Sequence, residues 1–364
     1  MDPHRTTDRI PLSPALTPIL PASKSAIRKE VDNARLLWLA AMSLVLGIAA
    51  AGIAQGLTAL IGLITNLAYY GRVSFAMVSP GGNALGLAAV AVPVVGGAVV
   101  GVMARFGSRA IRGHGIPEAM EQVLRNESRI PFKVMWLKPV SAAIAIGTGG
   151  PFGAEGPIIA TGGALGSVVG QWLRTSAVER KVLLAAGASA GMAATFGTPV
   201  AAVLLAVELL LFEFRLRSLV PVAIASATGA ACRIAWRGSD PFFALTAVSA
   251  PAPGALLAYT LIGAVIGLAS VAVTAAVYAI EDGFERLPIH WMWWPAIGGL
   301  FVGLIGLVAP QTLGVGYENI TGIISGEMAL RVVLILGTLK LASWLIALGS
   351  GTSGGTLAPL FTIG

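Results

Sequence analysis

Charged residues are scarce in this sequence. Only 11% of its 364 residues are charged and 56% are hydrophobic, whereas an average soluble domain carries about 25% charged residues. Several uncharged runs are long enough for a membrane-spanning helix, which needs roughly 17–25 apolar residues. This pattern excludes an ordinary soluble protein and predicts an all-α integral membrane protein with several passes. The runs are Leu36–Gly71, Val73–Ala104, Pro139–Ala154, Gly156–Leu173, Val182–Val207, Pro241–Ile280 and Leu341–Gly364.

Cysteine and histidine are also scarce. The single cysteine, Cys232, excludes a disulfide framework, and the three histidines form no cluster with metal-ligand spacing. A nucleophile elbow and a Walker-type phosphate loop are both absent. We therefore expect no enzyme activity, no metal and no cofactor. The net charge is +7, and the basic residues lie mainly in loops and in the N-terminal segment. That distribution suits the positive-inside rule and does not require a nucleic-acid partner.

Glycine and proline, in contrast, are abundant, with 46 and 21 residues. Small residues let membrane helices approach closely, and prolines inside apolar runs predict short or broken helices. Broken helices at membrane depth require protein or a water-filled cavity to satisfy their backbone, so the composition favours a pathway over an anchor. We expect residues 1–34 to form a polar cytoplasmic arm, with an amphipathic segment around Ser25–Arg35. Residues 35–364 are expected to form a transmembrane domain in the cell membrane.

An internal repeat with an offset of 202 residues organises the apolar part. Pro93, Lys138 and Pro157 match Pro295, Lys340 and Pro359. Gly113 and Gly115 match Gly314 and Gly316 at an offset of 201. The repeat predicts one half over about 35–235 and a second over about 253–364, the second ending early and therefore expected to be truncated. Such repeats are typical of secondary transporters, whose sites lie where discontinuous helices from the two halves meet. The matched lysines are interpreted as side chains that snorkel to the membrane interface.

Three glycine/proline motifs lie at boundaries of apolar runs: Gly113–Glu118, Gly153–Pro157 and Gly354–Pro359. Proline suits the first helical turn, so each motif predicts a helix N-terminus after a flexible loop. Helix N-termini carry unpaired N–H groups and partial positive charge, and they bind anions without a basic side chain. Such binding is weak enough to let an anion leave. Glu118 and Glu121, beside the first motif, are interpreted as a solvated loop face.

Glu155 is the one charged residue between Pro139 and Leu173. A carboxylate at membrane depth is a functional candidate by default. At a helix start it can occupy the place of an anion and release that place when it is protonated or displaced. The alternative is a carboxylate that only complements the helix dipole and has no gating role.

The ordered trio of motifs resembles that of the chloride channel/transporter (CLC) family, of the voltage-gated chloride channel type. The resemblance runs from about Arg35 to Gly364. It implies an inverted repeat of tilted helices, a homodimer with one pore per subunit, and Glu155 as the gating glutamate. It also implies that the amides of Thr356 and Leu357 contact the central anion. The expected anion-binding positions are Gly113, His114, Gly115, Ile116, Pro117, Gly153, Ala154, Glu155, Gly156, Gly355, Thr356 and Leu357.

The sequence departs from the family pattern at three positions. His114 replaces a serine, and it could donate from its imidazole or contribute its backbone alone. Leu357 replaces a phenylalanine. The inner proton glutamate of the exchangers corresponds to Leu209, while Glu208, one place earlier, is the candidate for a proton pathway. A passive channel and a proton-coupled antiporter therefore both stay open.

The function that we expect is selective transport of chloride-like inorganic anions across a lipid bilayer, gated by Glu155. Protons are a second substrate in the antiporter case. Two alternatives are a fluoride-selective member of the same family and a non-transporting membrane scaffold or sensor.

Overall fold

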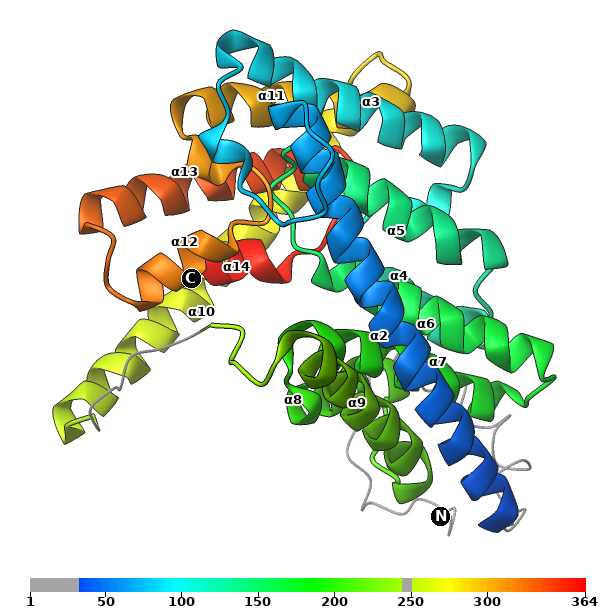
Figure 1. The fold of residues 1–364 in the computed structure, drawn as a ribbon. Coiled ribbons are helices and arrows are strands. Elements are labelled where there is room, and N and C mark those ends of the chain that lie inside the picture. The colour runs from blue at the N-terminus through cyan, green and yellow to red at the C-terminus, as the bar shows by residue number, and fades with distance from the viewer. Residues whose placement is uncertain (1–32, 244–250) are drawn as a thin grey trace, which may run out of the picture.

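The computed structural model describes residues 33–243 and 251–364, in which all regular secondary structure is helical (Figure 1). Residues 1–32 of the predicted polar arm, and with them most of the Ser25–Arg35 segment, lie outside the described residues. Over the first half of the chain the elements are α2 (Asn33–Tyr70), η2 (Pro80–Gly82), η3 (Gly86–Val90), α3 (Ala91–Phe106), η4 (Arg109–Ile111), α4 (Ile116–Arg125), α5 (Phe132–Gly147), α6 (Glu155–Trp172), α7 (Ala177–Phe196), α8 (Pro199–Ala206), η5 (Val207–Leu211) and α9 (Leu216–Arg237). Over the second half they are α10 (Pro253–Glu285), η6 (Trp291–Trp293), α11 (Trp294–Val308), η7 (Pro310–Thr312), α12 (Tyr317–Ile324), α13 (Leu330–Gly349) and α14 (Leu357–Ile363).

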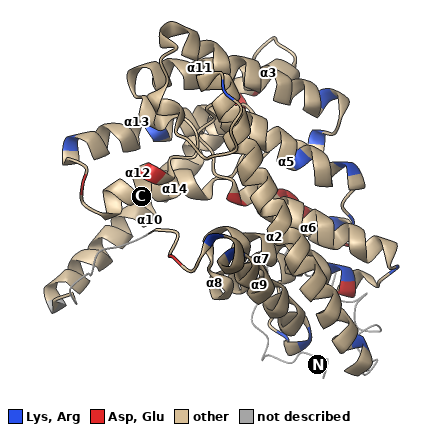
Figure 2. Ribbon diagram, in the orientation of Figure 1, with Lys and Arg blue, Asp and Glu red and all other residues tan. Residues whose placement is uncertain are grey.

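Within these ranges, six helical segments are long and apolar enough to cross a bilayer. Lys and Arg lie mostly near helix ends and in connecting segments, and long stretches of helix carry no charge (Figure 2). The all-α, multi-pass prediction is confirmed. The six segments are Asn33–Tyr70, Gly86–Phe106, Leu216–Arg237, Gly254–Glu285, Trp291–Val308 and Leu330–Gly349.

Most prolines of the apolar runs lie at helix starts, although Pro139 lies inside α5. Pro157, Pro199, Pro295 and Pro359 each lie in the first turn of their helix. Proline is tolerated there because the first N–H groups of a helix have no intrahelical partner. Several of the resulting helices are short, with 8 residues in α8 and 7 in α14. The predicted broken helices are therefore present, and the start of α6 is buried inside the protein.

The two halves of the repeat meet directly where α3 packs on α11, side by side at the top of Figure 1. A Cβ atom added to Gly97 would overlap the carbonyl oxygen of Pro295, and one added to Gly299 would overlap that of Pro93. These are repeat partners, and the contact is reciprocal. A reciprocal contact is what a two-fold relation produces, so the repeat in the sequence is also a pseudo-two-fold relation in space.

The matched lysines do not snorkel, and that prediction was wrong. Lys138 and Lys340 are only 1% and 0% exposed. Lys138 Nζ donates to the carbonyls of Ile111 and Gly113 at 2.9 and 2.8 Å. Lys340 Nζ donates to those of Thr312 and Gly314 at 2.9 and 2.7 Å. Each ammonium is solvated by backbone carbonyls of the loop before α4 or α12, so it needs no access to water.

Candidate functional site

The three motif loops, far apart in the sequence, are joined by backbone hydrogen bonds. Gly153 and Gly355 exchange two such bonds, each 2.9 Å long, and Gly354 N–H donates to the Gly113 carbonyl at 3.4 Å. Each loop leads into a helix, and these helices are α4, α6 and α14. The convergence of three helix starts that the sequence suggested is therefore present in the structure.

Glycine is required where these loops touch. A Cβ atom at Gly115 would overlap the Gly156 carbonyl, and one at Gly156 would overlap the His114 carbonyl. A Cβ atom at Gly355 would lie 2.6 Å from the Gly153 carbonyl oxygen. Gly115 also has a φ of +99°, which disfavours any residue with a side chain. The loops thus approach backbone to backbone.

Glu155 lies at this convergence, as the first residue of α6, and is 1% exposed. Its Oε1 accepts a 2.8 Å hydrogen bond from the Tyr317 hydroxyl. Its Oε2 is buried and has no hydrogen-bond partner within the described part of the chain. The backbone amides of Glu155 itself and of Ala358, in α14, lie beside the carboxylate. Glu155 therefore points into the protein, toward the third motif, and not toward lipid.

Tyr317, the first residue of α12, is a site residue that the sequence analysis missed. Its ring packs edge-on against Phe242 and Phe243, with centroid distances of 4.9 and 6.2 Å. The repeat held a signal that could have found it. Gly316 matches Gly115, so Tyr317 is the counterpart of Ile116, a residue already predicted in the site.

The first motif differs from the prediction in one respect. Glu118 does not belong to a solvated loop face: its Oε2 accepts from the Gly115 N–H at 2.6 Å. The carboxylate caps α4 because the orphan amides at a helix start need an acceptor. One amide of the predicted anion site is therefore already occupied by this side chain.

Some of the remaining predicted site residues lie at the contacts between the three loops, and others lie beside or apart from these contacts. Gly113, His114, Gly115, Gly153, Gly156 and Gly355 meet through their backbones, while Ile116, Pro117, Ala154, Thr356 and Leu357 flank these contacts at the helix starts. The His114 side chain is half-buried and has no hydrogen bond among the described residues. Glu208 is exposed on η5, a π-helical turn, and shares no hydrogen bond or ion pair with the site residues described. The structure does not bring Glu208 and Glu155 into contact.

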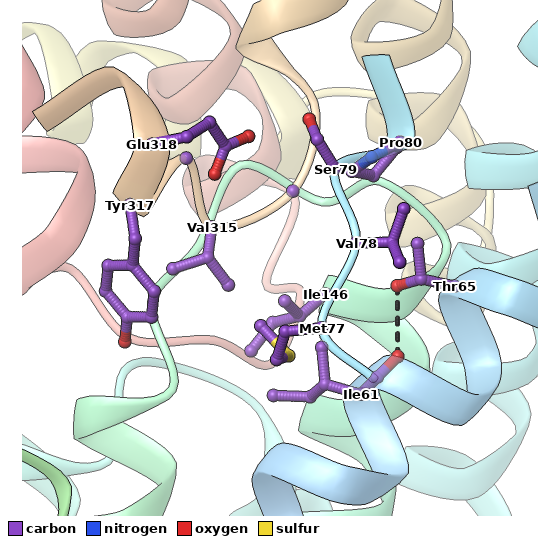
Figure 3. A pocket seen from close by; sticks show the side chains of 12 residues that line it. Ile61, Thr65, Met77, Val78, Ser79, Pro80, Ile146, Val315, Tyr317 and Glu318 are labelled. Atoms are coloured by element: carbon purple, nitrogen blue, oxygen red, sulfur yellow. Dashed lines mark hydrogen bonds between the residues drawn. The ribbon is translucent and has the colours of Figure 1, made fainter. Parts of the chain in front are cut away.

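A cavity of about 120 Å³ lies against the other side of Tyr317 (Figure 3). Its walls include Thr65 of α2, Ser79 beside η2, and Tyr317 and Glu318 of α12. Figure 3 shows the Tyr317 ring at one side of this cavity, with its hydroxyl turned away from Glu318. Tyr317 thus contacts the cavity through its ring and Glu155 through its hydroxyl.

These features define a class: a helical, multi-pass membrane protein whose two related halves meet at broken helices around a buried carboxylate. That architecture is typical of channels and secondary transporters. The sequence matches the family described as voltage gated chloride channel over residues 95–364. The chain belongs to this family.

Relatives with curated descriptions agree with this assignment. The chain is 30% identical over 299 residues to chloride channel protein CLC-e of Arabidopsis thaliana, covering 76% of this chain and 41% of that protein. It is also 30% identical over 270 residues to the H(+)/Cl(-) exchange transporter ClcA of Vibrio parahaemolyticus, covering 71% of this chain and 57% of that protein. The chain spans about half the length of the curated relatives that it matches.

Solved structures share the fold. A slow cyanobacterial Cl-/H+ antiporter aligns with a TM-score of 0.75 at 22% identity, covering 90% of this chain and 76% of that one. A CLC-type fluoride/proton antiporter aligns with a TM-score of 0.75 at 21% identity, covering 92% and 81%. The predicted CLC-type fold is confirmed.

Proposed function

We propose that this protein transports chloride-like inorganic anions selectively across a membrane and that Glu155 is the gate. The observation that carries the proposal is the buried Glu155 carboxylate, which lies where the three glycine loops meet and has one oxygen without a hydrogen-bond partner among the described residues. A carboxylate at this convergence of helix starts is stabilised by backbone amides, and the same amides could bind a free anion.

The physical argument is one of competition. Burying an uncompensated anion in a protein interior is costly, so the site favours one negative charge at a time. When the Glu155 carboxylate is protonated or swings out, the neighbouring amides of Glu155 and Ala358 lose their acceptor. An anion then takes its place, with the amides of Thr356 and Leu357 proposed as further contacts. Because these donors are neutral, the anion is held weakly enough to move on.

The names of the relatives support the substrate class. One is described as a chloride channel and another as a proton/chloride exchanger. They do not decide between the two modes, and neither does this chain, which has Leu209 at the inner proton position and an exposed Glu208 beside it. The role of Glu208, the homodimer and the placement in the cell membrane stay predictions.

The test is anion efflux from liposomes that contain the full-length protein. We expect chloride to leave down its gradient with a rate that depends on pH, and Glu155→Ala to weaken that dependence. Glu121→Ala is a matched control, because this carboxylate is exposed and its ion pair within the described ranges is with Arg125 on the same helix. Unchanged pH dependence in Glu155→Ala would contradict the gating role.

The same vesicles separate the remaining alternatives. Chloride flux coupled to uphill proton movement means exchange, and chloride flux without it means a channel. Faster fluoride than chloride efflux would indicate a fluoride-selective transporter. No flux of either ion from intact protein would favour a scaffold or sensor.

A further inference from the structure

The hydrogen bond between Tyr317 and Glu155 connects the two halves of the repeat. Glu155 begins α6 in the first half, and Tyr317 begins α12 in the second half. The distance from the Tyr317 hydroxyl to Glu155 Oε1 is 2.8 Å, a normal length for an O–H donor. None of the three glycine/proline motifs contains Tyr317, so its hydroxyl is a donor beyond the backbone amides considered so far.

The Tyr317 hydroxyl is held with its proton directed at this site. Edge-on contacts with Phe242 and Phe243 hold the ring. The backbone N–H of Ala154 lies beside the hydroxyl oxygen. The hydroxyl oxygen therefore has the Ala154 N–H as a donor nearby, and the hydroxyl proton is directed to the Glu155 carboxylate. A ring held in this way cannot easily follow Glu155 when the carboxylate moves out.

We propose that Tyr317 is a ligand of this site in both of its states. Its hydroxyl holds the Glu155 carboxylate in the closed state and donates the same hydrogen bond to the transported anion once the carboxylate has left. The proposal rests on the gating role of Glu155. A buried donor without a partner is unfavourable, and a small anion supplies an acceptor in the place that the carboxylate leaves. A neutral hydroxyl does this without the strong hold of a lysine or arginine.

Tyr317→Phe tests the closed state, because it removes only the hydroxyl and keeps the ring contacts. Without the donor, the charged carboxylate holds its place less strongly, so less acid is needed to displace it. We expect the pH of half-maximal chloride efflux to rise by about one unit. Tyr69→Phe is the matched control. It also removes the hydroxyl of a buried tyrosine, which donates to the Thr148 carbonyl at 3.0 Å, away from Glu155. It should leave the pH of half-maximal efflux unchanged.

Chloride binding tests the open state without relying on transport. In detergent-solubilised full-length protein, calorimetry would compare Glu155→Ala with the double variant Glu155→Ala, Tyr317→Phe. If the hydroxyl binds the anion, the double variant should bind chloride more weakly, on the order of tenfold. Adding Tyr69→Phe to Glu155→Ala should not change the affinity.

The outcomes separate this inference from the proposed function. If Glu155→Ala alters the pH dependence while Tyr317→Phe moves neither the pH of half-maximal efflux nor the chloride affinity, the role of Tyr317 is overturned and the gate stands. A shift in pH with unchanged affinity would overturn the role of Tyr317 as an anion ligand. If Glu155→Ala itself leaves the pH dependence unchanged, the proposed function fails first.

Discussion

The loop before α4 and the loop before α12 are repeat partners, and comparing them shows which parts of the protein are duplicated and which are not. Each loop contains two glycines with positive φ, and each is held by a buried lysine, Lys138 or Lys340. The side chains that follow differ. Glu118 caps its own helix, whereas its counterpart, Asn319, donates to the Gln311 carbonyl at 2.8 Å. The backbone scaffold is thus shared, and the site is asymmetric.

The asymmetry is greatest at the first helical residue. Ile116 begins α4 with an apolar side chain, while Tyr317 begins α12 with a hydroxyl that reaches Glu155. Duplication supplied two similar helix starts, and side-chain differences gave them different tasks. Backbone hydrogen bonds constrain both copies alike, whereas Tyr317 and Glu118 have counterparts of different chemistry, Ile116 and Asn319.

The largest expected effect tests the shared scaffold. Lys138→Met and Lys340→Met should each lower the free energy of unfolding by about 4 kcal/mol, because two or more buried carbonyls lose their donor at about 1–3 kcal/mol each. Denaturation in detergent, followed by a spectroscopic signal of unfolding, would measure this loss. The exposed Lys133 gives a control, since Lys133→Met should change stability by only about 0.5 kcal/mol or less. A large loss in only one of the two lysine variants would break the equivalence of the loops.

A smaller effect should distinguish the two loops. Gly115→Ala and Gly316→Ala both place a side chain at positive φ, at a cost of about 1–2 kcal/mol each. Only Gly115 faces rigid backbone, at the Gly156 carbonyl, whereas the nearest atom to a Cβ at Gly316 is the side-chain nitrogen of Asn319, at 2.9 Å. Gly115→Ala should therefore lose about 2 kcal/mol more.

Thermal unfolding of the two variants beside Gly52→Ala would measure that difference. A Cβ atom at Gly52 meets no atom within 4 Å, so Gly52→Ala should keep or slightly raise stability. Equal losses in Gly115→Ala and Gly316→Ala would show that the close contact between the first and second motifs does not distinguish the loops.

The smallest effect concerns the cap on α4. Glu118→Ala removes the acceptor of the Gly115 N–H and should lower stability by about 1 kcal/mol. It also frees that amide for an external anion, so we expect chloride affinity to rise in calorimetry. Asn319→Ala should lower stability by a similar amount, about 1 kcal/mol, without raising the affinity. A rise in both variants, or in neither, would contradict the assignment of the Gly115 amide to the site.

Much of the candidate site could be predicted from local sequence signals. Glycine and proline determine local backbone geometry, so the helix starts at Glu155 and Leu357 could be located from the motifs. An isolated carboxylate in an apolar run is rare, so the sequence alone points to Glu155. The errors arose where partners are distant. Lys138 and Lys340 resemble interfacial lysines until the carbonyls around them are seen, and those carbonyls lie 25 or more residues away.

The amino-acid sequence by itself determined that this is a multi-pass helical membrane protein, that it is internally duplicated and that its motifs begin helices. These properties follow from hydropathy and backbone preference, which act over a few neighbouring residues. Only the tertiary structure decided that Glu155 points inward, that Glu118 occupies one of the expected anion-binding amides and that Tyr317 reaches Glu155 from the other half. Tyr317 and Glu155 are 162 positions apart in the sequence, which shows why: a hydrogen bond depends on distance in space, and packing alone sets that distance.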